Sequence, residues 1–106
     1  MQATTYYPDR WLILKTPHCY KVFGVWFGGY ARGDSWKLNS GISDVEEFDD
    51  SYLFHGYSGS IYHCYKNNYG SSVYGYSVVH SFGDQMRVIE NTKQAMSAVL
   101  DAVAEK

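Results

Sequence analysis

The chain has 106 residues, a length typical of one domain, so we expect residues 1–106 to form a single unit. Nine basic residues against eleven acids give a formal net charge of -2, which argues against nucleic-acid binding, because phosphate binding favours a basic excess. No apolar stretch approaches the about 20 residues of a transmembrane helix, and the N-terminal residues lack a signal-peptide pattern. With two cysteines, these features favour a cytoplasmic protein with no membrane partner and no structural disulfide.

Aromatic residues are unusually frequent, because eleven tyrosines, five phenylalanines and three tryptophans make up 18% of the chain. A small domain needs only a few aromatic side chains for its core. Tyrosine joins an apolar ring to a hydroxyl group that prefers water, so the surplus is expected at the surface or at an interface. The composition therefore favours a binding protein over an enzyme.

The first part of the chain has the pattern of a β-rich domain. Residues 1–9 are polar and indicate a short arm or turn. Short runs rich in β-branched and aromatic residues then predict strands at 11–14, 19–27, 35–39, 42–48, 52–55 and 60–65. Residues 56–59, Gly-Tyr-Ser-Gly, predict a hairpin turn between the last two strands. Gly24 interrupts the second strand, which indicates a bulge or a close approach of other atoms.

The last third of the chain predicts helical structure. Residues 71–85 are ambiguous and are expected to be irregular or a short helix, and 86–90 a last strand or the approach to a helix. Asn91 and Gln94 have the spacing of a capping box, and apolar residues then recur at helical spacing. We therefore predict an α+β domain. It consists of an antiparallel β-sheet of four to six strands with a C-terminal amphipathic helix, about 91–105, packed on one face.

The tetrapeptide His-Cys-Tyr-Lys occurs twice, at 18–21 and 63–66. Neighbouring residues on a strand point to opposite faces, so the adjacent histidine and cysteine are poorly placed to bind one metal ion. We expect Cys19 and Cys64 to lie in the core, with no metal, cofactor or catalytic residue. The alternative is an enzyme or metal protein that uses His55, His63 or Cys64.

Two sets of residues are predicted to contact a partner. The first is an acidic run, for which a solvated edge strand and an anionic patch for a basic partner are both consistent interpretations. The second is a group of tyrosines, because the sheet face without a helix should present aromatic rings. The predicted binding residues are Asp44, Glu46, Glu47, Asp49, Asp50, Tyr57, Tyr65, Tyr69, Tyr74 and Tyr76.

Four segments resemble a group of short phage and prophage proteins. They are Tyr20-Lys21-Val22, Trp26-Phe27-Gly28-Gly29-Tyr30, residues 33–42 (GDSWKLNSGI) and residues 59–70 (GSIYHCYKNNYG). The resemblance covers about half of the chain and contains no catalytic motif. It implies an accessory viral protein, of unknown activity or of the type that inhibits host defence by binding, as anti-CRISPR proteins do. It assigns no role to any residue.

The sequence therefore predicts non-enzymatic binding that inhibits a host protein or nucleoprotein complex, for example a CRISPR-Cas effector. One alternative is a small nucleic-acid-binding module that uses surface tyrosines with Lys21, Arg32, Lys37 and Lys66. An exposed aromatic face is also consistent with a homodimer contact.

Overall fold

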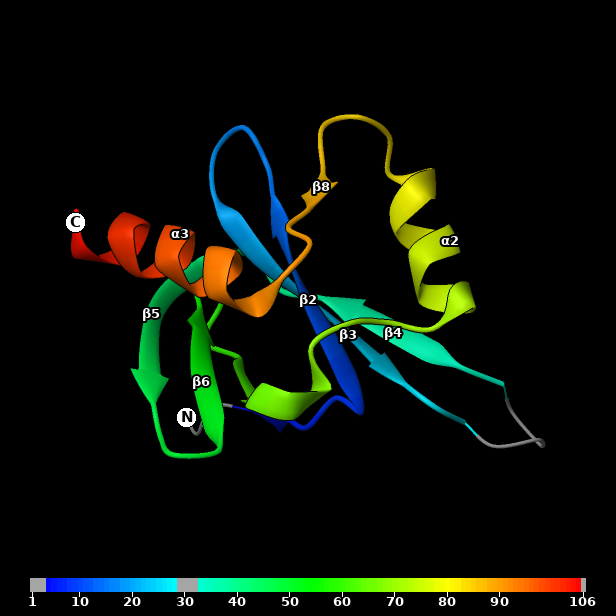
Figure 1. The fold of residues 1–106 in the computed structure, drawn as a ribbon, viewed down its shortest axis with the longest axis horizontal. Helices are drawn as coiled ribbons and strands as arrows, with labels where there is room; N and C mark the ends of the chain where they lie inside the picture. The colour runs from blue at the N-terminus through cyan, green and yellow to red at the C-terminus, as the bar shows by residue number, and fades with distance from the viewer. Residues whose placement is uncertain (1–3, 29–32, 106) are drawn as a thin grey trace.

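The computed structural model describes residues 4–28 and 33–105, and in them it confirms the α+β class. The described strands form two four-stranded sheets, where one sheet of four to six strands was expected. We call them the outer sheet and the central sheet. Two helices accompany them, α2 (Val73–Ser81) and the C-terminal α3 (Thr92–Ala104). Helix α3 lies beside strand β5 (Ile42–Glu47), and α2 lies on the opposite side of the molecule (Figure 1).

The outer sheet has the strand order β1-β7-β6-β5. Its strands are β1 (Thr5–Tyr6), β7 (Ile61–Tyr65), β6 (Ser51–Gly56) and β5 (Ile42–Glu47). The β5–β6 and β6–β7 pairs are antiparallel, whereas β1 runs parallel to β7. The hairpin turn predicted at 56–59 is confirmed, and Gly59 adopts a φ of 97°, which favours glycine.

The central sheet has the order β4-β3-β2-β8 and is antiparallel throughout. Its strands are β4 (Ser35–Leu38), β3 (Tyr20–Trp26), β2 (Arg10–Lys15) and β8 (Arg87–Val88). The β2–β3 register is continuous through Gly24, so this glycine does not mark a bulge. A Cβ atom there would lie 2.9 Å from the Pro8 Cβ, and the glycine therefore permits a close approach.

The N-terminal arm contains a strand that the sequence did not predict. Residues Thr5 and Tyr6 of β1 pair with β7, although 1–9 were expected to be an arm or a turn. The Tyr6 ring lies 6.3 Å from the Trp26 ring and 5.2 Å from the Tyr62 ring, measured between centroids. These contacts join both sheets and hold the arm beside β7. Because the partners are far along the chain, the short polar segment carries no local sign of its pairing.

Two cores divide the molecule into layers. The first lies between the two sheets and includes Trp11 and Ile13 together with residues of α3. The second lies between the central sheet and α2 and includes Leu12 and Leu14. The four consecutive apolar residues 11–14 of β2 are all buried, because this strand is covered on both faces. A strand buried on both faces has a continuous apolar run instead of an alternating pattern.

Both helices begin at a capping side chain. In α2 (Val73–Ser81) the Ser72 hydroxyl accepts a hydrogen bond from the Gly75 amide, and in α3 (Thr92–Ala104) Asn91 accepts one from Gln94. Each cap satisfies an amide that has no partner inside the helix. Of the alternatives left open, residues 71–85 contain the short helix α2 and residues 86–90 contain the strand β8, and the predicted C-terminal helix is confirmed. No helix in the described ranges is long and apolar enough to cross a membrane.

Tyr69 follows the short 3-10 helix η1 (Lys66–Asn68) and connects distant backbone groups. Its hydroxyl accepts a hydrogen bond of 3.1 Å from the Ile13 amide and donates one of 2.5 Å to the Ile89 carbonyl. Burial is the main cause that raises the pKa of Tyr69 to about 12, so the hydroxyl stays protonated and able to donate. Tyr69 was one of the predicted binding residues, but its hydroxyl is engaged with backbone groups inside the fold.

Tyr69→Phe is expected to lower the free energy of unfolding by about 1–3 kcal/mol, because it removes the hydrogen-bond partner of two partly buried backbone groups. Urea denaturation followed by circular dichroism measures this loss. Tyr74→Phe, at an exposed position on α2, is the matched control and should change stability by less than about 0.5 kcal/mol. Equal stability of both variants would contradict the bridging role.

Candidate functional site

The face of the outer sheet that points away from the central sheet has no helix over it in the described structure. Alternate residues of β6 and β7 point inward, and Phe54, Tyr62 and Cys64 lie in the first core. Their neighbours point to the opposite face, which we call the outer face. Helix α3 packs into the first core and α2 packs on the central sheet, so neither covers the outer face. The outer-face residues of β6 and β7 include Leu53, His55, Ile61, His63 and Tyr65.

Three side-chain rings in tilted contact lie at one end of this face. The ring centroid of His63 lies 5.1 Å from that of Tyr7 and 5.0 Å from that of Tyr65. We call Tyr7, His63 and Tyr65 the aromatic ladder. Tyr7 is 55% exposed and Tyr65 is 40% exposed, whereas the His63 Nε2 is buried and has no hydrogen-bond partner among the described residues. The ladder therefore presents exposed ring surface that is held in place by contacts between its own rings.

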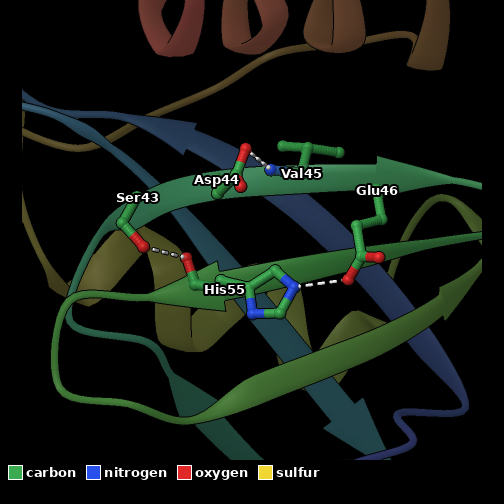
Figure 2. A network of polar contacts seen from close by, with 5 residues as sticks. All are labelled: Ser43, Asp44, Val45, Glu46 and His55. Atoms are coloured by element: carbon green, nitrogen blue, oxygen red, sulfur yellow. Dashed lines mark hydrogen bonds and ion pairs between the residues drawn. The ribbon is translucent and has the colours of Figure 1, made fainter. Parts of the chain in front are cut away.

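The opposite border of the outer face is the acidic edge strand β5. The His55 Nε2 on β6 lies 2.7 Å from the Glu46 Oε2, which is a hydrogen-bond distance (Figure 2). The Ser43 hydroxyl donates to the His55 carbonyl, and the Asp44 carboxylate accepts from the Val45 amide (Figure 2). The contacts of Ser43 and Glu46 with His55 link β5 to β6, whereas the Asp44 bond lies within β5.

All five acids of the predicted acidic run are exposed, as expected. Asp44, Glu46 and Glu47 lie on β5, and Asp49 and Asp50 lie in the turn between β5 and β6. We call these five residues the acidic edge. Lys66 makes an ion pair of 2.7 Å with Glu47, and this hydrogen bond is the main cause that raises the pKa of Lys66. Asp44, Asp49 and Asp50 have no ion pair in the described residues, so the edge keeps a negative charge.

The predicted tyrosines do not form one surface. Tyr65 lies at the end of β7 near the turn that carries Asp49 and Asp50, since the Lys66 amide donates to the Asp50 carbonyl. Tyr57 lies at the other end of β6, in the turn to β7, and it packs beside Gly41. Tyr74 and Tyr76 are on α2, which is on the far side of the central sheet (Figure 1). Of the five tyrosines predicted to bind a partner, Tyr65 belongs to the aromatic ladder.

Sequence reasoning missed Tyr7 and His63 as members of the surface. Tyr7 follows the unpredicted strand β1, so its place beside β7 depends on a parallel pairing across more than fifty residues. His63 was considered as a metal ligand. The alternation along the predicted strand already put it on the same face as Tyr65, and that signal would have been sufficient to find it.

The two His-Cys-Tyr-Lys copies have different environments. The first begins in the turn before β3, where Cys19 is half-buried, and the second lies mostly in β7, where Cys64 is buried as expected. Burial raises the pKa of the Cys64 thiol, which disfavours the reactive thiolate. Among residues 4–28 and 33–105 no three His, Cys, Asp or Glu side chains are placed to hold a metal ion.

The basic residues considered for nucleic-acid binding do not form one surface with the ladder. Lys66 is paired with Glu47 on the outer sheet. Lys21 and Lys37 are on adjacent strands of the central sheet, and Arg32 lies outside the described residues. The face with the exposed rings is therefore bordered by negative charge, which repels a phosphate backbone.

The outer face combines exposed rings, apolar side chains between them and a negatively charged border. Such a composition resembles a protein-binding surface, because aromatic residues are enriched where proteins dock and charge at the rim steers the partner. No protein-family model, curated protein or solved structure matches the chain. The site's own geometry favours docking of a protein over covalent chemistry.

Proposed function

We propose that this chain is a non-enzymatic binding protein that docks onto a basic surface of a partner protein through its outer face. The observation that carries the proposal is the position of the aromatic ladder on a sheet face that no described helix covers, with the acidic edge at its border. Rigid, exposed rings supply contact area at a small entropic cost. The pairing between His63 and its two tyrosine neighbours already orders these rings before a partner arrives.

The charge of the border selects the partner. Asp44, Asp49 and Asp50 carry carboxylates without an ion pair among the described residues, so a partner surface rich in lysine and arginine is attracted to them. Charges at the rim mainly raise the association rate and exclude partners of like charge, whereas buried rings at the centre slow dissociation. The acidic edge therefore mainly raises the association rate, and the ladder mainly lowers the dissociation rate.

We further propose that the partner is a host protein and that the chain is a phage-type accessory protein that inhibits it. A CRISPR-Cas effector is the first candidate to test. Such effectors hold nucleic acid in a positively charged channel, and an acidic edge flanked by aromatic rings is complementary to that surface. Binding there would compete with the phosphate backbone. This function would place the protein in the host cytoplasm.

Neutralising the three unpaired acids, as Asp44→Asn, Asp49→Asn and Asp50→Asn together, is expected to reduce the association rate with such an effector about tenfold or more at low salt. The effect follows from the loss of long-range attraction and should shrink as salt is added, because ions screen exposed charges. Surface plasmon resonance with an immobilised effector measures the rate. A DNA-cleavage assay measures the inhibition that results.

A matched control removes three other exposed acids, as Asp84→Asn, Asp101→Asn and Glu105→Gln, and changes the net charge equally. The control variant should associate at nearly the unmodified rate, because none of these acids lies on β5 or in the turn between β5 and β6. Equal rates for both triple variants would contradict a local role for the acidic edge. Size-exclusion chromatography tests self-association. If the protein eluted as a dimer, and only a monomeric variant bound the effector, the outer face would be assigned to the dimer contact.

A further inference from the structure

A second site lies between the two sheets, away from the outer face. A cavity of about 430 Å³ is lined by residues of both sheets, which come from β1, β3, β4, β7, the segment after β4 and the β6–β7 turn. This volume is at the small end of the range of about 300–1,000 Å³ that ligand pockets occupy. The polar residues that line it include Lys21, Lys37, Asn39, Ser40, Ser58 and Ser60.

The charge of the cavity is positive. Lys37 lies with its Nζ 5.1 Å from the centroid of the Tyr6 ring, and Tyr6 also lines the cavity. The attraction between an ammonium group and an aromatic face holds Lys37 there. Lys21 adds a second lysine, and none of the described residues that line the cavity is an aspartate or a glutamate. In a chain of net charge -2, two lysines without an adjacent carboxylate favour an anionic ligand.

Asn39 supplies a buried donor that nothing in the described residues satisfies. Only 3% of Asn39 is exposed, and its Oδ1 accepts a hydrogen bond of 2.8 Å from the Val22 amide. That bond fixes the orientation of the side chain. The Nδ2 group is buried and has no hydrogen-bond partner among the described residues. The Nδ2 group has almost no accessible surface, so Asn39 shapes the wall of the cavity and its amide does not face a ligand there.

The serines add hydroxyl donors at the same place. Ser40 donates to the Ser58 Oγ over 3.1 Å and accepts from the Ser58 amide over 2.9 Å, which leaves the Ser58 hydroxyl hydrogen available. Gly56 allows the hydroxyl groups of Ser40 and Ser60 to pack closely against the backbone at the end of β6. A Cβ atom on Gly56 would lie 3.2 Å from the Ser60 Oγ and 3.3 Å from the Ser40 Oγ. The hydroxyl groups therefore gather around a position without a side chain.

We propose that this cavity binds the phosphate group of a small phosphate monoester. A phosphate dianion offers only acceptor oxygens at its charged end, and the lysines and the serine hydroxyls supply donors. Two lysines match its charge of about two at neutral pH. The volume leaves room for a small organic group on the fourth oxygen. This site does not depend on the docking function, because none of its residues belongs to the ladder or the acidic edge.

Titration calorimetry in a low-salt buffer tests the site with inorganic phosphate, glycerol 3-phosphate and glycerol. We expect saturable binding of both phosphate compounds and none of glycerol. The double variant Lys21→Gln, Lys37→Gln should weaken binding at least tenfold, whereas Lys93→Gln, an exposed lysine on α3, should leave it unchanged. Amide NMR signals of residues 37–40 and 58–60 should shift on binding of glycerol 3-phosphate.

Three results would overturn the site. They are no saturable binding of either phosphate compound, equal binding by the double lysine variant, and NMR shifts confined to other parts of the chain. Binding of inorganic phosphate with exclusion of glycerol 3-phosphate would also refute a monoester ligand. Ser58→Ala provides a variant without a charge change, and it should weaken binding several-fold while circular dichroism shows an unchanged fold.

Discussion

Replacement of Trp11 by alanine is expected to lower the free energy of unfolding by about 3–5 kcal/mol. Trp11 is fully buried, and its ring contacts those of Tyr52, Phe54 and Tyr69, with centroids 6.0, 5.3 and 4.8 Å away. Its indole Nε1 also donates a hydrogen bond of 2.7 Å to the Tyr65 carbonyl. Because small domains have a total stability of about 5–15 kcal/mol, this one change removes a large part of it.

Urea denaturation followed by circular dichroism measures the loss, and Trp36→Ala is the matched control. Trp36 stacks on Phe23 at 5.7 Å but is 38% exposed, so its truncation leaves a smaller cavity. We expect a loss of about 1 kcal/mol for Trp36→Ala, the centre of the range for single substitutions. If both variants lost the same stability, the first core would not have the dominant role that its burial indicates.

Truncation of the ladder is expected to have the largest effect on partner binding. Tyr7→Ala and Tyr65→Ala should each weaken binding about 30-fold, because aromatic hot spots cost about 2 kcal/mol or more, and about 1.4 kcal/mol corresponds to a factor of ten. Both side chains are exposed and contact the His63 ring, so their removal takes contact area from the outer face while the first core stays intact. Equilibrium binding to the immobilised effector measures the effect.

The exposed tyrosines of α2 provide the control that separates the effect of a tyrosine's position from the effect of its residue type. Tyr74 and Tyr76 are exposed to a similar degree as Tyr65, but they lie on the far side of the central sheet. Tyr74→Ala and Tyr76→Ala should therefore bind within about twofold of the unmodified protein. Greater losses from the α2 variants than from the ladder variants would place the docking surface on α2 and contradict the proposed face.

The local elements could be predicted because their signals are local. The alternation in 60–65 correctly assigned Tyr62 and Cys64 to one face and Tyr65 to the other. The Asn91 cap and the apolar spacing after it located α3, since a helix cap and a helix stripe involve residues within a few positions of each other. Leu100 is an exception among the apolar residues of α3, because it is 42% exposed.

The surplus of tyrosine was interpreted correctly only in part. Exposed tyrosines exist, and Tyr7 and Tyr57 are more than half exposed. Tyr52 and Tyr62 are nevertheless core residues, and Tyr69 satisfies backbone groups inside the fold. A sequence contains no direct record of burial for a side chain that has both an apolar ring and a polar hydroxyl, so the same residue type serves three purposes here.

The sequence by itself determined the α+β class, most strands, both helix regions and the exposed acidic run. Those features depend on periodicity, capping and charge over short stretches. Only the tertiary structure decided that the strands form two sheets, that Tyr7 contacts His63, and that Lys37, Asn39 and the serines share one cavity. These arrangements depend on strand register between distant segments, for which the free energy comes from packing in the two cores and is not written in any local pattern.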